Sequence, residues 1–353
     1  MKEFWSSRIR DLVPYTPGEQ PKDRQFIKLN TNENPYPPSP RVLEALRQSV
    51  NEGLRLYPDP ECSALRAALA SRYGLSERQV FVGNGSDEVL AFAFQAFFGV
   101  GDTIAFPDIT YSFYPVYANM FGIHCKTVPL NEDFTIPVDA LMVGHQGVVI
   151  ANPNAPTGIE LPQQELRRLL EGNRDVVVIV DEAYVDFGGQ SALPLLKEYP
   201  NLLVVQTMSK SRSLAGMRIG FAFGSENLIQ AINCVKNSIN SYTLDRMAIA
   251  AGTAAVEDEE YFQSCCGKVT RTRERVAAAL REQGFVVLPS RSNFLFAGHP
   301  RIPAQTLFAQ LREAGILVRY FKQPRIDNFL RISIGTDEEM DRFLEVAAQL
   351  TAQ

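Results

Sequence analysis

The stretches VVVIVDEAY, residues 176–184, and LLVVQTMSK, residues 202–210, decide the fold. Each begins with a continuous apolar run, at Val176–Val180 and Leu202–Thr207, and continues into polar residues. Such runs are typical of strands that are buried on both faces, as in a parallel sheet covered by helices. Four further runs of this kind lie at Val80–Val82, Thr103–Phe106, Gly147–Ala151 and Ile219–Phe223.

Segments with helical spacing separate several of these runs. Apolar residues recur at helical intervals in Ser63–Tyr73, Asp87–Phe98 and Phe113–Phe121. Pro40 suits the first turn of a helix over Arg41–Val50, because no amide donor is needed there. The alternation predicts an α/β fold with a large domain, in which a mostly parallel sheet is sandwiched by helices.

The pattern changes after about residue 250, where strands and helices no longer alternate regularly. The sequence predicts a smaller α+β domain there, preceded in the chain by the large domain and by a proline-rich, irregular N-terminal arm. The expected boundaries are 1–40 for the arm, 41–250 for the large domain and 251–353 for the small domain. In the small domain, helices are expected at Glu257–Gln283, Leu307–Ala314 and Asp337–Gln349, and strands at Phe285–Leu288, Phe294–Phe296, Leu317–Tyr320 and Phe329–Ile334.

Composition excludes several classes of function. The chain has 35 basic and 40 acidic side chains, a net charge of −5, which does not suit a nucleic-acid partner. Its five cysteines form no CxxC pair, which indicates a reduced, cytoplasmic protein. The three histidines are far apart, so we expect no metal site. We also expect no signal peptide and no membrane span, because no apolar stretch is long enough.

The segment Gly83-Asn84-Gly85-Ser86-Asp87-Glu88 follows the first apolar run. Ligands of open α/β sheets bind at the carboxyl ends of the strands, so these residues are candidates for a site. The glycines allow a sharp turn, and the free amides at a helix start suit a phosphate. The alternative is a glycine turn with a Ser or Asp helix cap.

Asp181 and Tyr184 follow the run Val176–Val180. A buried aspartate needs a partner, and a cationic ring nitrogen would serve. Tyr184 can reach a phenolic oxygen on the same ring. A helix cap or a Mg²⁺ carboxylate is the alternative for Asp181.

Lys210 follows the run Leu202–Thr207, in a polar loop that also carries Ser209 and Arg218. Lysine is the side chain that forms an imine with an aldehyde, and arginine and serine suit a phosphate. A solvated lysine is the alternative, and neither a P-loop nor a GxGxxG fingerprint is present. A phosphate cradle, an acid for a ring nitrogen and an imine-forming lysine together predict one cofactor, pyridoxal phosphate.

The chain resembles the fold-type-I aminotransferases and, within them, the histidinol-phosphate aminotransferase family. The resemblance runs nearly end to end. It rests on Lys28–Tyr36 (KLNTNENPY), Tyr57–Asp59, Gly83–Glu88, Asn152–Gly158 (NPNAPTG), Asp181–Tyr184, Ser209-Lys210 with Arg218, and Leu330–Ser333.

The resemblance implies a role for each of these residues. Lys210 would carry the cofactor and shuttle a proton, Asp181 would keep the ring nitrogen protonated, and Tyr184 would bond the phenolic oxygen. Tyr111 would stack on the ring, and Tyr57 would reach the phosphate of a neighbouring subunit in a homodimer. The cofactor phosphate would lie among Gly85, Ser86, Asp87, Ser209 and Arg218, with Asp87 ordering the loop rather than touching the anion. The substrate would contact Arg331, Arg319, Tyr15, Asn32 and Tyr242.

The sequence departs from the family at Ala155, where many relatives have an asparagine that bonds the ring oxygen. Asn154 or Asn152 is expected to take that role. The implied reaction is transamination between histidinol phosphate and 2-oxoglutarate, which gives imidazole acetol phosphate and glutamate and runs in reverse in histidine biosynthesis. The alternatives are an aromatic amino-acid aminotransferase and a pyridoxal-phosphate decarboxylase of a phosphorylated amino acid. A non-catalytic regulator would need a DNA-binding module, and a nicotinamide dehydrogenase would need its glycine fingerprint.

Overall fold

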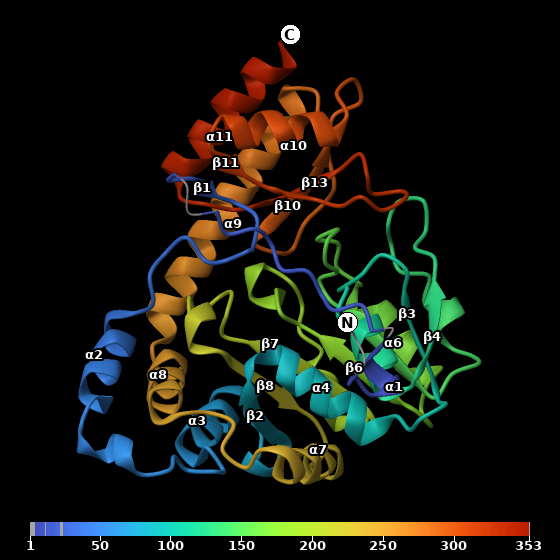
Figure 1. Cartoon of the computed structure of the whole chain (residues 1–353), viewed down its shortest axis with the longest axis vertical. Helices are drawn as coiled ribbons and strands as arrows, with labels where there is room; N and C mark the ends of the chain where they lie inside the picture. The colour runs from blue at the N-terminus through green and yellow to red at the C-terminus, as the bar shows by residue number, and fades with distance from the viewer. Residues whose placement is uncertain (1–3, 11, 22–23, 353) are drawn as a thin grey trace.

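The large domain of this computed structural model is built on a seven-stranded sheet, drawn in the lower part of Figure 1. The structure describes residues 4–10, 12–21 and 24–352. The strand order is β2-β8-β7-β6-β5-β3-β4, and only β8 runs antiparallel to its neighbours, so the predicted mostly parallel sheet is confirmed. The strands are β2 (Val80–Asn84), β3 (Thr103–Pro107), β4 (His124–Val128), β5 (Gly147–Ala151), β6 (Val177–Asp181), β7 (Leu202–Thr207) and β8 (Ile219–Phe223).

Helices cover both faces of this sheet. On β6, Val178 and Val180 belong to one core cluster, whereas Ile179 between them belongs to another, as the alternation of side chains along a strand requires. The first cluster includes residues of α2 (Pro40–Ser49), α3 (Ser63–Tyr73), α6 (Gln163–Glu171) and α8 (Arg246–Glu257), and the second includes residues of α4 (Gly85–Phe97), α5 (Tyr114–Phe121) and α7 (Glu226–Ile239).

The C-terminal part of the chain forms a separate α+β layer, in the upper part of Figure 1. Its sheet has the order β12-β13-β10-β9 and is antiparallel throughout. The long helix α9 (Glu259–Glu282) leads from the large domain into this layer. The other elements are β9 (Val286–Val287), β10 (Phe294–Gly298), α10 (Ala304–Glu313), β12 (Arg319–Tyr320), β13 (Leu330–Ser333) and α11 (Asp337–Thr351).

The prediction of an irregular arm over residues 1–40 is wrong in two places. A short helix, α1, spans Ser7–Arg10, and β1 (Ile27–Lys28) pairs in parallel with β11 (Ile316–Leu317). This pairing joins segments almost 300 residues apart, so no local pattern reveals it. Residues 1–3, 11 and 22–23 of the predicted arm lie outside the described residues.

Two further predictions in the second half of the chain are corrected. The strand expected at Leu317–Tyr320 is divided between β11 and β12, because its two halves pair with different strands. The helix expected from Glu257 begins only at Glu259, after Asp258 has ended α8. The sequence did not predict β4, α6, α7 or α8. Short 3-10 helices lie at Glu52–Arg55, Glu77–Gln79, Val138–Leu141, Val185–Phe187, Leu193–Lys197 and Ala215–Met217.

The direction of β8 brings several candidate residues to one edge of the sheet. Asn84 at the end of β2 pairs with Ile219 at the start of β8, and Thr207 at the end of β7 pairs with Gly220. The residues after β2, after β7 and before β8 therefore meet at this edge. A Cβ at Gly220 would lie 2.2 Å from the amide nitrogen of Ser86, so only glycine permits this approach. None of the helices in the described ranges is both long and apolar enough to cross a bilayer.

Candidate active site

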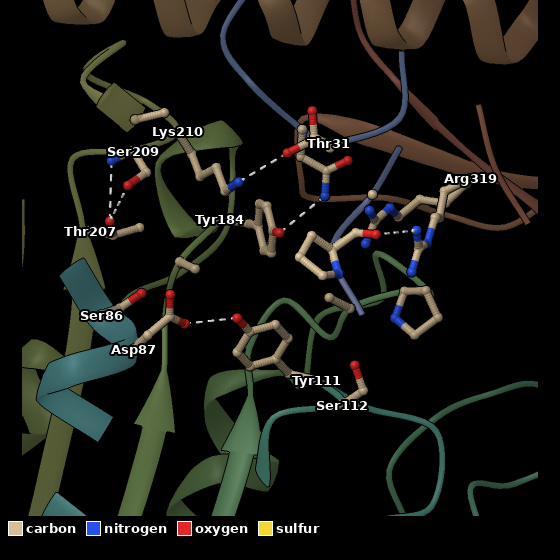
Figure 2. A pocket seen from close by; sticks show the side chains of 18 of the residues that line it. Thr31, Ser86, Asp87, Tyr111, Ser112, Tyr184, Thr207, Ser209, Lys210 and Arg319 are labelled. Carbon is tan, nitrogen blue, oxygen red and sulfur yellow. Dashed lines mark hydrogen bonds between the residues drawn. The ribbon is translucent and has the colours of Figure 1, made fainter. Parts of the chain in front are cut away.

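A pocket opens at this edge, between the large sheet, the N-terminal segment and the small sheet (Figure 2). Asp181 lies at the end of β6, and Lys210 lies in the loop after β7. Arg331 of β13 and Thr31 of the N-terminal segment complete the opposite wall. Residues that are far apart in the sequence thus line one cavity.

Lys210 is held from the side of the N-terminal segment. Its Nζ donates to the carbonyl oxygen of Thr31 at 3.1 Å and lies 5.9 Å from the centre of the Tyr184 ring. The side-chain amide of Asn34 donates to the carbonyl oxygens of Lys210 and Ser211, at 3.0 and 3.2 Å. The amine therefore points into the pocket, and Asn34 fixes the backbone of Lys210 and of the next residue.

Asp181 is a buried carboxylate, 5% exposed, beneath the floor of the pocket. Tyr114 donates its hydroxyl to Oδ2 at 3.0 Å, and the amide of Ala183 donates to Oδ1 at 3.2 Å. Burial raises the pKa of Asp181 to about 6, although both hydrogen bonds oppose that rise. Within the described part of the chain no cationic side chain forms an ion pair with this carboxylate. A cationic ring N–H would supply the missing partner.

The start of α4 forms a cradle beside Arg218. Gly85 has φ +83°, and a Cβ there would lie 2.6 Å from Nη2 of Arg218. Asp87 pairs with Nη2 of Arg218 at 3.3 Å and accepts a hydrogen bond from the Tyr111 hydroxyl at 2.8 Å. Asp87 thus orders the arginine and the tyrosine, while the free amides of the helix start and the guanidinium suit an anion.

Two serines line the pocket next to this cradle. Ser86 comes from the first turn of α4, and Ser209 from the loop after β7. The Ser209 and Thr207 hydroxyls lie within hydrogen-bond distance of each other, at 3.0 Å. Both positions agree with the predicted phosphate contacts, which remain predictions.

The opposite wall carries two arginines from directly paired residues, Arg319 on β12 and Arg331 on β13. The Arg331 guanidinium lies between the rings of Phe294 and Phe321, at 5.4 and 5.5 Å from their centres, and its Nη2 donates to the carbonyl oxygen of Asn30. Its Nε has no hydrogen-bond partner among the described residues. Burial and, more weakly, the charge of Arg319 lower the pKa of Arg331. This wall suits an anionic group.

Tyr15 and Tyr111 supply aromatic surface between the two walls. Tyr15 stacks on Phe113 with ring centres 4.4 Å apart, and it lies 6.3 Å from Tyr111. Burial and the nearby charge of Asp87 raise the pKa of Tyr111 well above its ordinary value, so its hydroxyl stays protonated. The pocket therefore offers flat apolar surface for a ring compound.

The structure does not bring Asn154 to the pocket. Its side-chain amide donates to the carbonyl oxygen of Ile109 and to the hydroxyl of Thr157, both at 3.0 Å, and its Oδ1 accepts from Thr110. Ala155 lines the pocket instead, with a methyl group. The expectation that Asn154 contacts the cofactor therefore has no support, because its side chain bonds Thr157 of its own loop and Ile109 and Thr110 of the segment after β3.

Tyr57 and Tyr242 stack on each other with ring centres 4.7 Å apart, and neither lines the pocket of its own chain. Tyr57 is 77% exposed. Asn32 does line the pocket, but its side chain donates to the Tyr184 hydroxyl at 3.0 Å. Asn32 was predicted only as a substrate contact.

The sequence did not single out Tyr114 or Phe321. Tyr114 follows the edge of β3 and opens α5, where its aromatic pattern indicates core packing as readily as a bond to Asp181. Phe321 lies after β12, and only the tertiary structure shows that it covers Arg331. A polar hydroxyl in an otherwise apolar helix start was the one available signal for Tyr114.

These residues fit pyridoxal phosphate. The buried carboxylate of Asp181 lines the pocket, the amine of Lys210 is aimed at the cavity, and Gly85 leaves the space in front of Arg218 that a side chain would fill. Serine hydroxyls and helix amides complete a donor set for a phosphate. The chemistry of the donors and the shape of the cradle agree.

This fold and this pocket are those of a class of enzymes, since residues 24–346 match the family model described as aminotransferase class I and II. A histidinol-phosphate aminotransferase of Clostridium acetobutylicum is 56% identical over 345 residues, 98% of each chain. One of Marinomonas sp. is 56% identical over 343 residues, 96% of this chain and 97% of the other. The chain belongs to the histidinol-phosphate aminotransferase family, as the sequence predicted.

The solved structures agree with this family. A histidinol-phosphate aminotransferase from Sinorhizobium meliloti, in complex with pyridoxal-5'-phosphate, superposes with a TM-score of 0.86 at 26% identity. The superposition covers 93% of this chain and 92% of that one. The predicted fold type is confirmed.

Proposed function

We propose that this chain is a pyridoxal-phosphate enzyme that transfers the amino group between glutamate and imidazole acetol phosphate, in histidine biosynthesis. The products are 2-oxoglutarate and histidinol phosphate, and the reverse direction starts from histidinol phosphate. Relatives from Clostridium acetobutylicum, Clostridium beijerinckii and Clostridium botulinum that share 52–56% of its residues are histidinol-phosphate aminotransferases. When bound, the cofactor supplies an aldehyde that takes up an amino group and a ring that accepts electrons.

We expect the residues at the edge of the large sheet to perform the chemistry. Lys210 would hold the aldehyde through Nζ and would move the proton of the substrate α-carbon as a general base. Asp181 would hold the proton on the ring nitrogen, and Tyr184 would donate to the phenolic oxygen. Tyr111 would stack on the ring, and Arg218 would bind the phosphate. Gly85, Ser86 and Ser209 would form the rest of the phosphate site, and Asp87 would keep Arg218 and Tyr111 in place.

The choice of substrate rests on one observation, the pairing of Arg319 with Arg331. Like charges on directly paired residues repel each other, and neither arginine has a carboxylate partner among the described residues. A dianionic phosphate would neutralise both through forked hydrogen bonds. Arg331, which is the more enclosed, would also bind the carboxylate of glutamate, and Tyr15 would pack against the substrate.

We further propose that the active unit is a homodimer. Tyr57 and Tyr242 lie outside the pocket of their own chain and would serve the pocket of the second subunit, Tyr57 at the phosphate and Tyr242 at the substrate. Exposed apolar side chains near Tyr57 in the sequence support a buried contact there: Val50, Leu54 and Leu56 are 51–62% exposed. All five cysteines are free thiols, which suits the cytoplasm.

The absorption spectrum of the purified, cofactor-loaded protein tests this proposal. Glutamate and histidinol phosphate are added to separate samples, and phenylalanine to a third. We expect the visible band of the Lys210-bound cofactor to fall, and a shorter-wavelength band to rise, with glutamate and with histidinol phosphate. Because the expected reaction is transamination, we expect no release of CO₂. We also expect 2-oxoglutarate to restore the visible band.

Other outcomes assign other functions. Conversion by glutamate and phenylalanine but not by histidinol phosphate would leave an aromatic amino-acid aminotransferase. Release of CO₂ without any need for a 2-oxo acid would indicate a decarboxylase. If no visible band forms even after cofactor is supplied, the role of Lys210 is wrong and the proposal fails.

A further inference from the structure

The loop of Ala155 cannot supply a second hydrogen-bond donor to the cofactor ring. The side chain of Asn154 is engaged by Ile109, Thr110 and Thr157, as described above. Asn152 is engaged as well, since its Oδ1 accepts from the amide of Leu161 at 2.8 Å and its Nδ2 donates to the carbonyl oxygen of the same residue. Ala155 presents only a methyl group. Both asparagines considered from the sequence thus bond protein groups and do not line the pocket, whereas the polar group in contact with Tyr184 comes from another segment.

Asn32 is the residue in contact with the Tyr184 hydroxyl, and it is almost completely buried. Every polar group of Asn32 is bonded. Its amide donates to Oγ of Ser333 at 2.9 Å, the Ser333 hydroxyl donates back to Oδ1 at 2.8 Å, and Asn293 donates to its carbonyl oxygen at 2.9 Å. These contacts orient the side chain so that Nδ2 is left to donate to Tyr184.

The backbone of Asn32 is also unusual, with φ +56° in the left-handed region. Asparagine tolerates this conformation better than other residues with a side chain, and only glycine adopts it freely. A strained backbone persists only where the surroundings fix it, here through Ser333 and Asn293. The position thus combines a special backbone conformation with a side-chain donor.

The contact determines where the Tyr184 proton points. A phenol has one proton to donate, and when its oxygen accepts a hydrogen bond, the proton must go to another acceptor. Accepting a bond also strengthens the bond that the hydroxyl donates. We propose that Asn32 is a positioning residue, which directs the Tyr184 proton into the pocket and so strengthens its bond to the phenolic oxygen of the cofactor. This inference rests on the proposed function.

Three single variants at two positions, together with one double variant, separate this role from a structural one. Asn32→Gly keeps the left-handed backbone and removes the donor. Asn32→Asp keeps the shape but places an acceptor opposite Tyr184, which draws the tyrosine proton away from the pocket. Tyr184→Phe removes the hydroxyl itself, and the double variant of Asn32→Gly with Tyr184→Phe tests whether Asn32 acts through it.

The measurement is the pH at which the visible band of the loaded enzyme titrates, without substrate. A donor to the phenolic oxygen withdraws electrons from the ring system, so its loss raises this pH. We expect Asn32→Gly to raise it by roughly 0.3 to 1 pH unit, the size of one hydrogen bond, and Asn32→Asp by at least as much. Tyr184→Phe should give the largest shift, and the double variant should match Tyr184→Phe alone.

Two results would overturn the inference: an unshifted titration in Asn32→Gly, or a double variant in which the two shifts add. If the Asn32 variants do not fold, as judged by circular dichroism, Ser333→Ala takes their place. It releases Oδ1 of Asn32 and should shift the pH in the same direction by less, and no shift would again refute the role. Absence of the visible band in the unaltered enzyme would instead refute the proposed function.

Discussion

The sheet side and the opposite side of the pocket are built differently. On the sheet side, Asp181, Lys210 and Arg218 lie at the ends of three adjacent strands, β6, β7 and β8. On the opposite side, Arg331 and Asn32 come from segments about 300 residues apart, which are joined by side-chain contacts such as that of Asn32 with Ser333. The first side is fixed by a sheet and suits chemistry that needs invariant geometry, whereas the second suits recognition and adjustment of the ligand.

The largest effect that the comparison predicts is that of Lys210→Ala. Without the amine there is neither a nucleophile for the aldehyde nor a general base, so transamination should fall by about 10⁴-fold or more. The fold should persist, because the only hydrogen bond of the side chain in the described structure goes to the carbonyl oxygen of Thr31. Single-turnover absorbance with glutamate measures the rate, and circular dichroism serves as the control for folding. Near-normal turnover would show that Lys210 is not the residue that binds the aldehyde.

Asp181→Asn should come next, with a loss of turnover of about 10³-fold, since an amide does not hold a proton on the ring nitrogen. The same change should stabilise the cofactor-free protein at neutral pH. Burial raises the pKa of Asp181 to about 6, so the folded state binds a proton more tightly than the unfolded state. Its contribution to stability therefore falls as pH rises from about 4 to 6, and the loss of about 3 kcal/mol persists above that range.

Urea unfolding of the cofactor-free protein at pH 5 and pH 8 measures this second effect. The unaltered protein should lose more stability between the two pH values than Asp181→Asn does. Glu182, the next residue, provides the internal comparison, because burial raises its pKa to about 7 and its cost remains in both proteins. Equal losses in the two proteins would mean that Asp181 already has a cationic partner without the cofactor.

The sequence predicted the two sides of the pocket unequally. Asp181 and Lys210 could be found because an apolar strand ends just before a polar group, and a parallel sheet gathers such ends at one edge. The pairing of Arg319 with Arg331 depends on a strand register, and the contact of Thr31 with Lys210 spans 179 residues. No local pattern encodes either of these.

Two of the errors have the same origin. The backbone of Ile27–Lys28 is a strand only because Ile316 and Leu317 lie beside it, so an irregular arm was the reasonable prediction. Asn154 belongs to a motif that resembles a cofactor contact, yet its side-chain amide bonds Ile109 and Thr157 and does not line the pocket. Residue identity restricts what a side chain can bond, and tertiary packing decides which bond it makes.

Substitution of Arg319 or Arg331 tests the difference between the two sides of the pocket, because these residues should affect substrate binding more than the chemical step. Arg331→Lys should raise KM about 100-fold for both glutamate and histidinol phosphate, since an ammonium cannot form the forked contact. Arg319→Ala should raise KM about 10-fold for histidinol phosphate alone, because only the phosphate needs a second cation. Steady-state kinetics with both donors measures the two effects. Arg342→Ala, an exposed arginine paired with Glu345 on α11, is the matched control and should change neither KM.

The smallest predicted effect concerns a residue that belongs to neither side of its own pocket. Tyr57 is exposed in the single chain and stacks on Tyr242, so in the proposed dimer its hydroxyl would bind the cofactor phosphate of the second subunit. Tyr57→Phe keeps the stacking and removes one hydrogen bond, so the dissociation constant of the cofactor should rise about 3- to 10-fold. Tyr242→Phe, the other half of the stacked pair, should leave that constant unchanged and alter only the KM of histidinol phosphate. Titration of the cofactor-free dimer with pyridoxal phosphate distinguishes the two. If both variants bind the cofactor like the unaltered protein, the phosphate is held within one chain by Arg218 and the start of α4, and the sheet side is complete without a partner.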